Sequence, residues 1–420
     1  MRKITLYLFV LSCLAGAAYA DDLTTPLQPG DLDPTYGTGG KVRTDFPTTA
    51  GLGGAALQPD GKIVVAGIAG NTDPYIVARY TLDGSPDPTF GTANGRQIAP
   101  FTILARAVAV QPDGKIIVGG VGQGTVANSF ALFRLNSNGT TDTTFGTNGL
   151  VVVNFPAESS VYDVAVLPDG KILVAGEVFL DNSFLLARLN TNGSLDGTFG
   201  TGGTVRPKMG PTATAIGIAR ALAIQPDQKI VVVGVAEDSW AIARFLPNGD
   251  LDQDFSGDGK ILFNFGVGTE TATDVVLQSD GKIVVAGFRA GQTGPSTVVA
   301  RLNADGTTDN NFGPGANGIV QPVDGSNRAT SVVIEASGKI LIGGDISQLP
   351  ETDFLVTRLN TNGTKDTTFA VGGSARTSFG VEDRAEELLL QPDGKVVAAG
   401  NSVNSGTGAF VLARYLTVPA

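Results

Sequence analysis

The chain has 420 residues, a formal net charge of −11 and no histidine. Without histidine it has no Ser-His-Asp or Cys-His catalytic group, no histidine-ligated metal and no histidine-based pH switch. Its acidity argues against nucleic acid and anionic membrane surfaces as partners and leaves weak Ca²⁺ binding open. The 57 glycines and the lack of a long 3.6-residue apolar pattern predict an all-β chain with many tight turns.

Residues 1–20 are typical of a secretory signal peptide. Arg2 and Lys3 supply the positive start, an apolar stretch follows, and Ala18-Tyr19-Ala20 forms a small-residue cleavage site. The apolar stretch is too short for a membrane span, and no later segment is long enough. The single cysteine, Cys13, lies inside this segment, and the alternative of lipoprotein cleavage before it stays open. We therefore expect an exported protein, periplasmic or secreted, whose mature domain is residues 21–420 and has no disulfide.

A turn motif, Gln-Pro-Asp-Gly-Lys in its fullest form, recurs every 53–58 residues. Each repeat contains four strand-like stretches. A first strand, as at 161–167, leads through the Pro-Asp-Gly turn into a second, as at 171–175. A third, as at 184–189, leads through an Asn-Gly turn toward a fourth, of the kind seen at 149–155. The motif lysines are Lys62, Lys115, Lys171, Lys229, Lys282, Lys339 and Lys395.

The third strand of each repeat predicts how the repeats assemble. An aromatic residue stands four positions before a recurring arginine, so the two share one face of the strand, while Leu and Ala occupy the other. These aromatics are Tyr75, Phe130, Phe184, Trp240, Phe354 and Phe410, with Thr297 as the exception. Both faces are largely apolar, so each sheet must be covered on both sides, as in sheets stacked around an axis. The sequence predicts a seven-bladed β-propeller of four-stranded antiparallel blades.

The order of strands at the two chain ends predicts how the ring closes. The chain begins with a fourth-type strand at 41–46 and ends after a third-type strand at 410–415. We expect the first of these to become the outer strand of the blade that holds the second, so that both termini enter one sheet.

Each recurring arginine is followed eight residues later by an aspartate. The pairs are Arg79/Asp87, Arg134/Asp142, Arg188/Asp196, Arg244/Asp252, Arg301/Asp309 and Arg358/Asp366. Arg414 has no such partner and Asp33 has no such arginine, so we expect these two to pair across the closure. An unpaired charge between sheets is costly, whereas a carboxylate can accept hydrogen bonds from the guanidinium. Because the pair recurs in every repeat, we favour a structural role over a ring of anion-binding arginines.

The combination of Leu-Asp-x-Thr-Phe-Gly, Gln-Pro-Asp-Gly-Lys-Ile-Val-Val-Ala-Gly and Phe-x-x-Ala-Arg-Leu-Asn-x-Asp-Gly resembles the delta-60 repeat. Segments 57–67 and 184–193 carry it most clearly, and it extends over residues 30–416. The resemblance implies an extracytoplasmic bacterial β-propeller of unknown function. It brings no catalytic residues with it.

Function is expected on the propeller face that carries the second-to-third loops and the blade-to-blade connections. These segments vary between repeats, whereas the Pro-Asp-Gly and Asn-Gly turns of the other face are uniform. The candidate ligand-binding residues there are charged residues placed just before the inner strands: Arg106, Arg220, Arg328, Arg384, Glu382, Asp383 and Glu386. Several arginines near one opening can bind an anionic group; a solvated, charged loop face is the simpler interpretation.

The leading hypothesis is a non-enzymatic, exported scaffold that binds an unknown small molecule, glycan or protein on this variable face. It is expected to be a monomer, with no membrane span, nucleic-acid partner, cofactor or metal. A carboxylate-based hydrolase drawing on 382–387, or a structural or adhesive cell-surface module, stays open as an alternative. The Asp250-x-Asp252-x-Asp254 triplet lacks the Gly and Glu that a calcium loop needs farther along.

Overall fold

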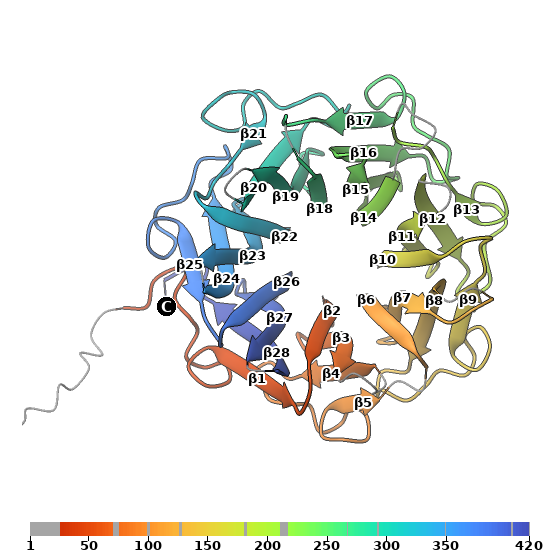
Figure 1. Cartoon of the computed structure of the whole chain (residues 1–420), viewed down its shortest axis with the longest axis horizontal. Coiled ribbons are helices and arrows are strands. Elements are labelled where there is room, and N and C mark those ends of the chain that lie inside the picture. The colour runs from red at the N-terminus through yellow and green to blue at the C-terminus, as the bar shows by residue number, and fades with distance from the viewer. Residues whose placement is uncertain are drawn as a thin grey trace, which may run out of the picture.

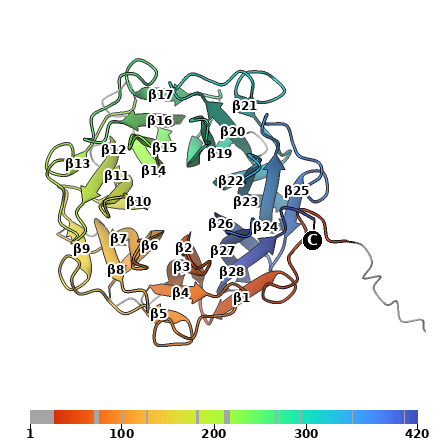
Figure 2. The same cartoon turned by 180° about the vertical axis from the view of Figure 1, so that it is seen from behind.

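The structure, a computed structural model, describes residues 26–69, 75–98, 101–125, 128–179, 183–210, 217–266, 268–291, 294–348, 350–404 and 406–419. Within these ranges the regular secondary structure consists of strands, which are arranged radially around a central axis (Figure 1). The view from behind shows the same radial order (Figure 2). The segment predicted as a signal peptide lies outside the described residues. In the described part of the chain, no helix has the length and apolar character needed to cross a membrane.

Seven antiparallel blades, numbered I to VII here, make up the ring, and the strands of each follow one another outward from the channel. Blade I contains β2 (Ala50–Leu57), β3 (Ile63–Ala69), β4 (Ile76–Tyr80) and β5 (Arg96–Ile98). Blade II contains β6 (Ile103–Val110), β7 (Ile116–Gly122), β8 (Ser129–Leu135) and β9 (Leu150–Val153). Blade III contains β10 (Ser159–Val166), β11 (Ile172–Val178), β12 (Ser183–Leu189) and β13 (Thr204–Val205). Blade IV contains β14 (Gly217–Ile224), β15 (Ile230–Ala236), β16 (Ser239–Phe245) and β17 (Lys260–Phe263).

The remaining blades complete the circle. Blade V contains β18 (Glu270–Leu277), β19 (Ile283–Gly291), β20 (Gly294–Leu302) and β21 (Ile319–Val320). Blade VI contains β22 (Ser326–Ile334), β23 (Ile340–Gln348), β24 (Glu351–Leu359) and β25 (Ser374–Thr377). Blade VII contains β26 (Glu382–Leu390), β27 (Val396–Asn404), β28 (Thr407–Tyr415) and β1 (Lys41–Phe46). A single parallel bridge, Thr352 to Glu382, links blades VI and VII into one connected sheet.

The ring closes through the N-terminal strand, as the sequence predicted. Strand β1 pairs antiparallel with β28, from Lys41 opposite Ala413 to Phe46 opposite Gly408. The chain just before β1 adds further main-chain bonds, because the Asp33 amide donates to the Arg414 carbonyl at 2.8 Å. Both ends of the chain are therefore held in blade VII.

The core lies between the blades. Strand β11, for example, is buried along its whole length, since blade II covers one face and blade IV the other. Trp240 is fully buried, and its Nε1 donates to the Phe288 carbonyl of the next blade at 3.1 Å. The aromatic residue of the third strand is thus a core residue here, in keeping with the sequence prediction.

A second contact between blades is a repeated group that we call the belt: the seven recurring arginines, their aspartates and the seven turn lysines. In six blades the arginine Nε lies 2.7–2.8 Å from an aspartate Oδ2. In blade VII the Arg414 Nη2 lies 2.9 Å from Asp33 Oδ2. The turn lysine of the same blade approaches the same oxygen at 2.8–3.1 Å. The sequence analysis had not assigned a role to these lysines.

Each belt arginine also reaches the neighbouring blade. Its Nη1 donates to a carbonyl in the third-to-fourth turn of the next blade, as Arg134 does to Thr191 at 2.6 Å, and Arg414 does the same to Leu82 of blade I at 2.5 Å. The guanidinium carbons lie 4.4–4.8 Å from the ring centres of the Phe or Tyr residues that follow the aspartates. All of these belt arginines are therefore engaged in holding blades together.

The belt environment keeps its aspartates ionised. Burial by itself would raise the pKa of Asp87, but hydrogen bonds from Thr89 and Lys62 and the charge of Arg79 outweigh it and hold the pKa well below its usual range. The same balance lowers the pKa of Asp33 at the closure.

Candidate functional site

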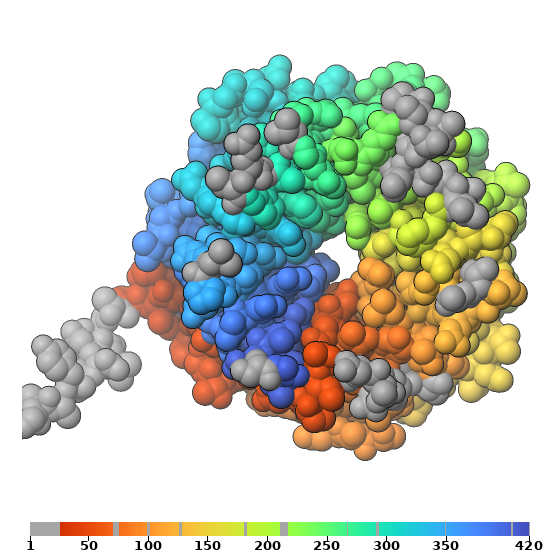
Figure 3. All heavy atoms as spheres, viewed as in Figure 1, coloured from red at the N-terminus to blue at the C-terminus, as the bar shows by residue number. Residues whose placement is uncertain are grey.

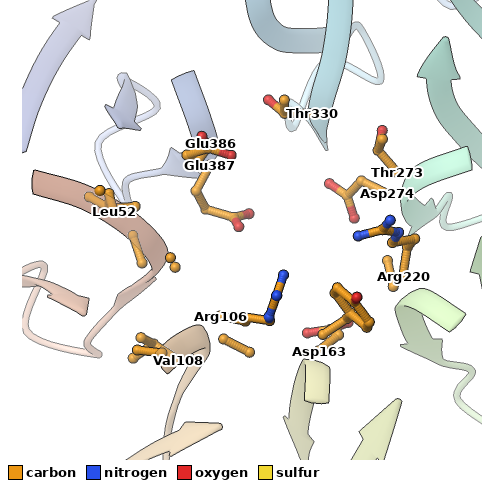
Figure 4. Close-up of a pocket in the computed structure, with 18 of the residues that line it drawn as sticks. Leu52, Arg106, Val108, Asp163, Arg220, Thr273, Asp274, Thr330, Glu386 and Glu387 are labelled. Carbon is orange, nitrogen blue, oxygen red and sulfur yellow. The ribbon is translucent and has the colours of Figure 1, made fainter. Parts of the chain in front are cut away.

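The inner strand of every blade carries a β-bulge at the same place. The pairing with the second strand skips one residue, so this residue has no partner across the ladder. In blade order the skipped residues are Gly53, Arg106, Tyr162, Arg220, Thr273, Thr330 and Glu386. These bulge residues line the channel, and Figure 4 labels Arg106, Arg220, Thr273, Thr330 and Glu386 among them.

The bulge residues surround a cavity of about 550 Å³ in the channel. The channel opening is visible as a hollow at the centre of the ring (Figure 3). Blade I contributes no side chain at its bulge, because a Cβ on Gly53 would lie 1.9 Å from the Ala105 carbonyl oxygen of blade II. The residues after six of the bulges also line the cavity: Gly54, Ala107, Asp163, Ala221, Asp274 and Glu387. The seventh, Ser331, is buried behind it.

Two arginines converge on one side of the cavity around a tyrosine. The guanidinium carbons of Arg106 and Arg220 lie 4.8 and 4.4 Å from the ring centre of Tyr162, which belongs to the blade between them. The Tyr162 hydroxyl donates to Glu177 Oε1 at 2.6 Å, which fixes the ring. Both arginine Nε atoms are buried without a hydrogen-bond partner, and across the described residues neither guanidinium forms an ion pair. Figure 4 shows both groups pointing into the channel.

Carboxyl groups occupy other parts of the same wall. Asp163 accepts hydrogen bonds from the amides of Val164 and Leu222 at 2.7 and 2.8 Å. Burial raises the pKa of Asp163 to about 7, against these two hydrogen bonds, and the Asp274 carboxyl adds to the rise. Leu222 lies in the next blade, so this carboxyl also links two inner strands.

Asp274 and Glu387 meet at one hydroxyl. Ser331 Oγ lies 3.1 Å from both Asp274 Oδ2 and Glu387 Oε1, and the Val332 amide donates to Asp274 Oδ2 at 2.7 Å. Burial raises the pKa of both carboxyls, and the negative charges of Asp274 and Asp163 raise that of Glu387 further. Both shifts follow from burial and, for Glu387, from the closeness of the other channel carboxyls.

A second charged group lies on the neighbouring blades VI and VII. Arg328 stands opposite Asp345 in the β22–β23 ladder, and Arg384 lies two residues before Glu386 on β26. Burial raises the pKa of Glu386 to about 7; the charge of Asp345 adds to this effect and that of Arg384 opposes it. Burial likewise raises the pKa of Asp345, against both arginines.

The structure places the predicted site residues differently from the sequence analysis in three respects. The four arginines lie within the inner strands rather than just before them. They form no single cluster, since Arg106 and Arg220 line the cavity and Arg328 and Arg384 do not. Asp383 is fully buried and accepts hydrogen bonds from the amides of Phe379 and Gly380, because it points to the opposite side of β26 from Arg384.

The acidic segment 382–387 is split in the same way. Glu382 is exposed at the end of β26, Asp383 faces the blade interior, and Glu386 and Glu387 face the cavity. Asp252 of the triplet 250–254 belongs to the belt, with Arg244 at 2.7 Å and Lys229 at 3.0 Å from its Oδ2. Among the described residues there is no group of three or more acidic or cysteine side chains arranged to hold a metal ion.

Sequence reasoning missed Tyr162, Asp163 and Asp274 as channel residues and named Glu387 only as part of the acidic segment 382–387. A usable signal was present, because the residues after the bulges all stand eight positions before the turn lysines. Aligning the seven repeats on that lysine brings Asp163, Asp274 and Glu387 to one position where other repeats have Gly, Ala or Ser.

Comparison with solved structures places the chain among propellers. Ulvan lyase, a polysaccharide lyase of family PL25, is 10% identical with a TM-score of 0.53, over 90% of this chain and 98% of that chain. Sqt1 of Chaetomium thermophilum, bound to the N-terminus of the ribosomal protein L10, is 11% identical with a TM-score of 0.52, over 87% and 98%. A protein from Lactobacillus plantarum is 13% identical with a TM-score of 0.50, over 85% and 96%. At such identities the likeness shows the fold alone.

The family comparison is more specific. No curated protein matches the chain. The family described as "Domain of unknown function (DUF5122) beta-propeller" matches seven segments, which together make up more than half of the chain: residues 58–90, 111–145, 167–199, 225–255, 278–312, 335–369 and 391–418. Each matched segment begins near a Pro-Asp-Gly turn, and the first six end at the aromatic residue after the belt aspartate. The repeat resemblance seen in the sequence is thereby confirmed, and the chain belongs to this β-propeller family.

Proposed function

We propose that the protein is an exported, non-enzymatic binding scaffold that holds an anionic ligand group in its central channel, reached from the variable face. The observation that carries this proposal is the pair Arg106 and Arg220. Both guanidinium groups enter one cavity, and within the described chain neither has a carboxylate partner.

The energetics favour an external anion. Contact with the face of Tyr162 stabilises each guanidinium by about 0.5–2 kcal/mol, which is small beside the cost of removing a charge from water without a partner. A carboxylate or phosphate can accept paired hydrogen bonds from such a group. The belt arginines, by contrast, already have an aspartate, so they offer no comparable site.

The non-enzymatic part of the proposal is supported by how segment 382–387 lies. A hydrolase using two of these carboxyls would need them on either side of a bound substrate. Asp383 instead binds two backbone amides inside the blade, and Glu382 is exposed beyond the cavity. The fold gives no guidance here, because propellers support many unrelated functions.

The export part of the proposal is supported by the signal-like residues 1–20. Fractionation of cells that express the full chain checks it. Recovery of a shortened chain outside the cytoplasm is the expected result, and a full-length cytoplasmic chain would contradict it.

Isothermal titration of acetate, propionate, succinate and inorganic phosphate tests the binding site. At least one anion should bind the native chain, and Arg106→Gln with Arg220→Gln should weaken that binding at least tenfold. Arg96→Gln is the matched control, because Arg96 also stacks on an aromatic ring, Phe46 at 5.4 Å, but on the outer strand β5. Binding that survives the double substitution, or that Arg96→Gln removes equally, would overturn the site.

A further inference from the structure

The cavity that holds the two arginines also holds more carboxyl groups than these arginines balance. Asp163, Asp274, Glu386 and Glu387 line the same space as Arg106 and Arg220. They come from blades III, V and VII, and Figure 4 shows Glu386 and Glu387 across the channel from Arg106. Asp163, in blade III, lies between the two arginine blades, whereas Asp274, Glu386 and Glu387 form the acidic side of the wall in blades V and VII.

The acidic side has an unmet need for hydrogen bonds. Ser331 has one hydroxyl proton, yet its oxygen lies 3.1 Å from acceptor oxygens of both Asp274 and Glu387. The Leu388 amide already donates to this hydroxyl oxygen at 3.1 Å. One of the two carboxyls can accept the Ser331 proton, and the other needs a proton or donor from elsewhere. Among the described residues, Glu387 has no other hydrogen-bond partner.

Of the two carboxyls, Glu387 is the one free to meet a ligand. Asp274 is held by the amides of Val275 and Val332, each at 2.7 Å. Among the described residues, Glu387 has the Ser331 contact alone, and it lines the cavity. Both carboxyls line the cavity, and a donor there can bind Glu387 while Asp274 keeps its two amides.

We infer that the channel ligand is a small zwitterion, an amino acid or a short peptide, whose carboxylate lies on Arg106 and Arg220 and whose ammonium group lies on Glu387. This inference rests on the proposed function and names the class of ligand for that site. An ammonium group offers three donors and one positive charge, which is what the unpaired carboxyl and the excess of acidic groups lack.

The dimensions and chemistry of the wall agree with such a ligand. A cavity of about 550 Å³ is in the range of small-molecule sites. An ammonium group is favoured over a divalent cation because no cluster of three ligating side chains occurs within the described ranges. The Thr273 and Thr330 hydroxyls donate to the carbonyls of Ala329 and Ala385 in the next blades, so they join the wall together.

Matched pairs of probes separate this inference from the proposed function. The full chain is titrated with glycine, β-alanine and γ-aminobutyrate, each against the carboxylate of the same carbon number: acetate, propionate and butyrate. At one or more lengths the amino carboxylate should bind at least tenfold more tightly. Equal affinity within each pair would overturn the zwitterion and leave the anion site standing. Absence of binding by all six would overturn both.

A substitution then assigns the ammonium end. Glu387→Gln keeps the size of the side chain and removes its charge. It should weaken binding of the preferred amino carboxylate at least tenfold and change binding of the matching carboxylate less than twofold. Glu351→Gln, at an exposed glutamate of β24, is the control and should change neither. An equal loss for both probes, or no loss, would overturn the role of Glu387; if the variant fails to fold, the probe pairs on the native chain decide.

A titration with CaCl₂ in place of the amino carboxylates tests whether Glu387 binds a metal ion rather than an ammonium group. Calcium binding that Glu387→Gln abolishes and that excludes the amino carboxylate would overturn the zwitterion in favour of a metal.

Discussion

The belt and the ring of seven bulge residues, which we call the bulge ring, both recur once in every blade. They differ in how uniform their residues are and in whether their charges are paired. In the belt each blade has the same Arg, Asp and Lys, and each charge has partners within 3.1 Å. In the bulge ring the seven positions hold Gly, Arg, Tyr, Arg, Thr, Thr and Glu, and across the described residues the two arginines form no ion pair.

This difference separates two requirements on one repeat. Each blade must join its neighbours in the same way, so the residues that join them are the same in every copy. A ligand, in contrast, breaks the sevenfold symmetry, because its groups differ from end to end. Residues that depart from the repeat while facing one cavity are therefore the best candidates for binding.

The largest loss of stability should come from removing the side chain of one belt arginine. Arg358 has 2% of its side chain exposed and contacts Asp366, Glu335 and the Thr417 carbonyl. Arg358→Ala should lower the free energy of unfolding by about 3–5 kcal/mol, since it leaves Asp366 buried without its arginine. Urea unfolding measures this loss. Arg289→Ala is the control, because among the described residues Arg289 has a single hydrogen bond, to Gln321 at 3.3 Å, and should matter far less; equal losses would remove the distinction between belt and surface arginines.

A closely related prediction asks whether the closure is an ordinary member of the belt. Asp33 and Asp142 have the same partners: a threonine two residues on, the turn lysine and the belt arginine. Asp33→Asn and Asp142→Asn should each reduce stability by about 2–4 kcal/mol, and by amounts that agree within about 1 kcal/mol. Chemical unfolding of both variants provides the comparison. A negligible cost for Asp33→Asn alone would show that the ring does not depend on its N-terminal segment.

The pH dependence of stability should show the belt and the channel acting in opposite directions. Belt aspartates have folded pKa values below those of the unfolded chain, so their contribution is complete above about pH 4 and is lost as the pH falls. Glu386 and Asp163 have folded pKa values raised to about 7, so stability is lost as the pH rises from about 4 to 7. The maximum is expected near pH 5.

Glu386→Gln tests how much the channel carboxyls contribute to the loss of stability at higher pH. It should reduce the loss of stability between pH 5 and 8 by about 1–2 kcal/mol and leave the acid side unchanged. Urea midpoints from pH 3 to 9 for the native chain, Glu386→Gln and the exposed-site variant Glu351→Gln give the comparison. An alkaline side as steep in Glu386→Gln as in the native chain would contradict the raised pKa.

Repetition explains why the architecture was predictable and the site was only partly so. Seven copies of one strand pattern determine blade number, strand order and the closure by 41–46, and the structure agrees on each. The site depends on a bulge that puts two successive residues on the channel side, which breaks the two-residue alternation used to assign faces. Arg106 and Arg220 were predicted because a charged residue at their position departs from the repeat pattern. Asp163 and Asp274 were overlooked because the residues before them are uncharged.

Orientation explains the remaining errors. The sequence analysis placed Asp383 and Glu386 in one group because both are charged and lie near the variable face. In the structure, Asp383 points into the blade and Glu386 lies in the channel wall. The face of each residue can be assigned only once the start of the strand and its bulge are known.

One measurement tests the contrast between belt and channel most directly: thermal unfolding of the Arg106→Gln, Arg220→Gln variant with and without the anion or amino carboxylate that binds best. Without ligand, its midpoint should stay within about 3 °C of the native chain, because only the contacts with Tyr162 are lost. With ligand, the native midpoint should rise and that of the variant should not. A variant destabilised to the extent of Arg358→Ala, or one that retains the ligand-induced rise, would show that the channel arginines serve the same structural purpose as the belt.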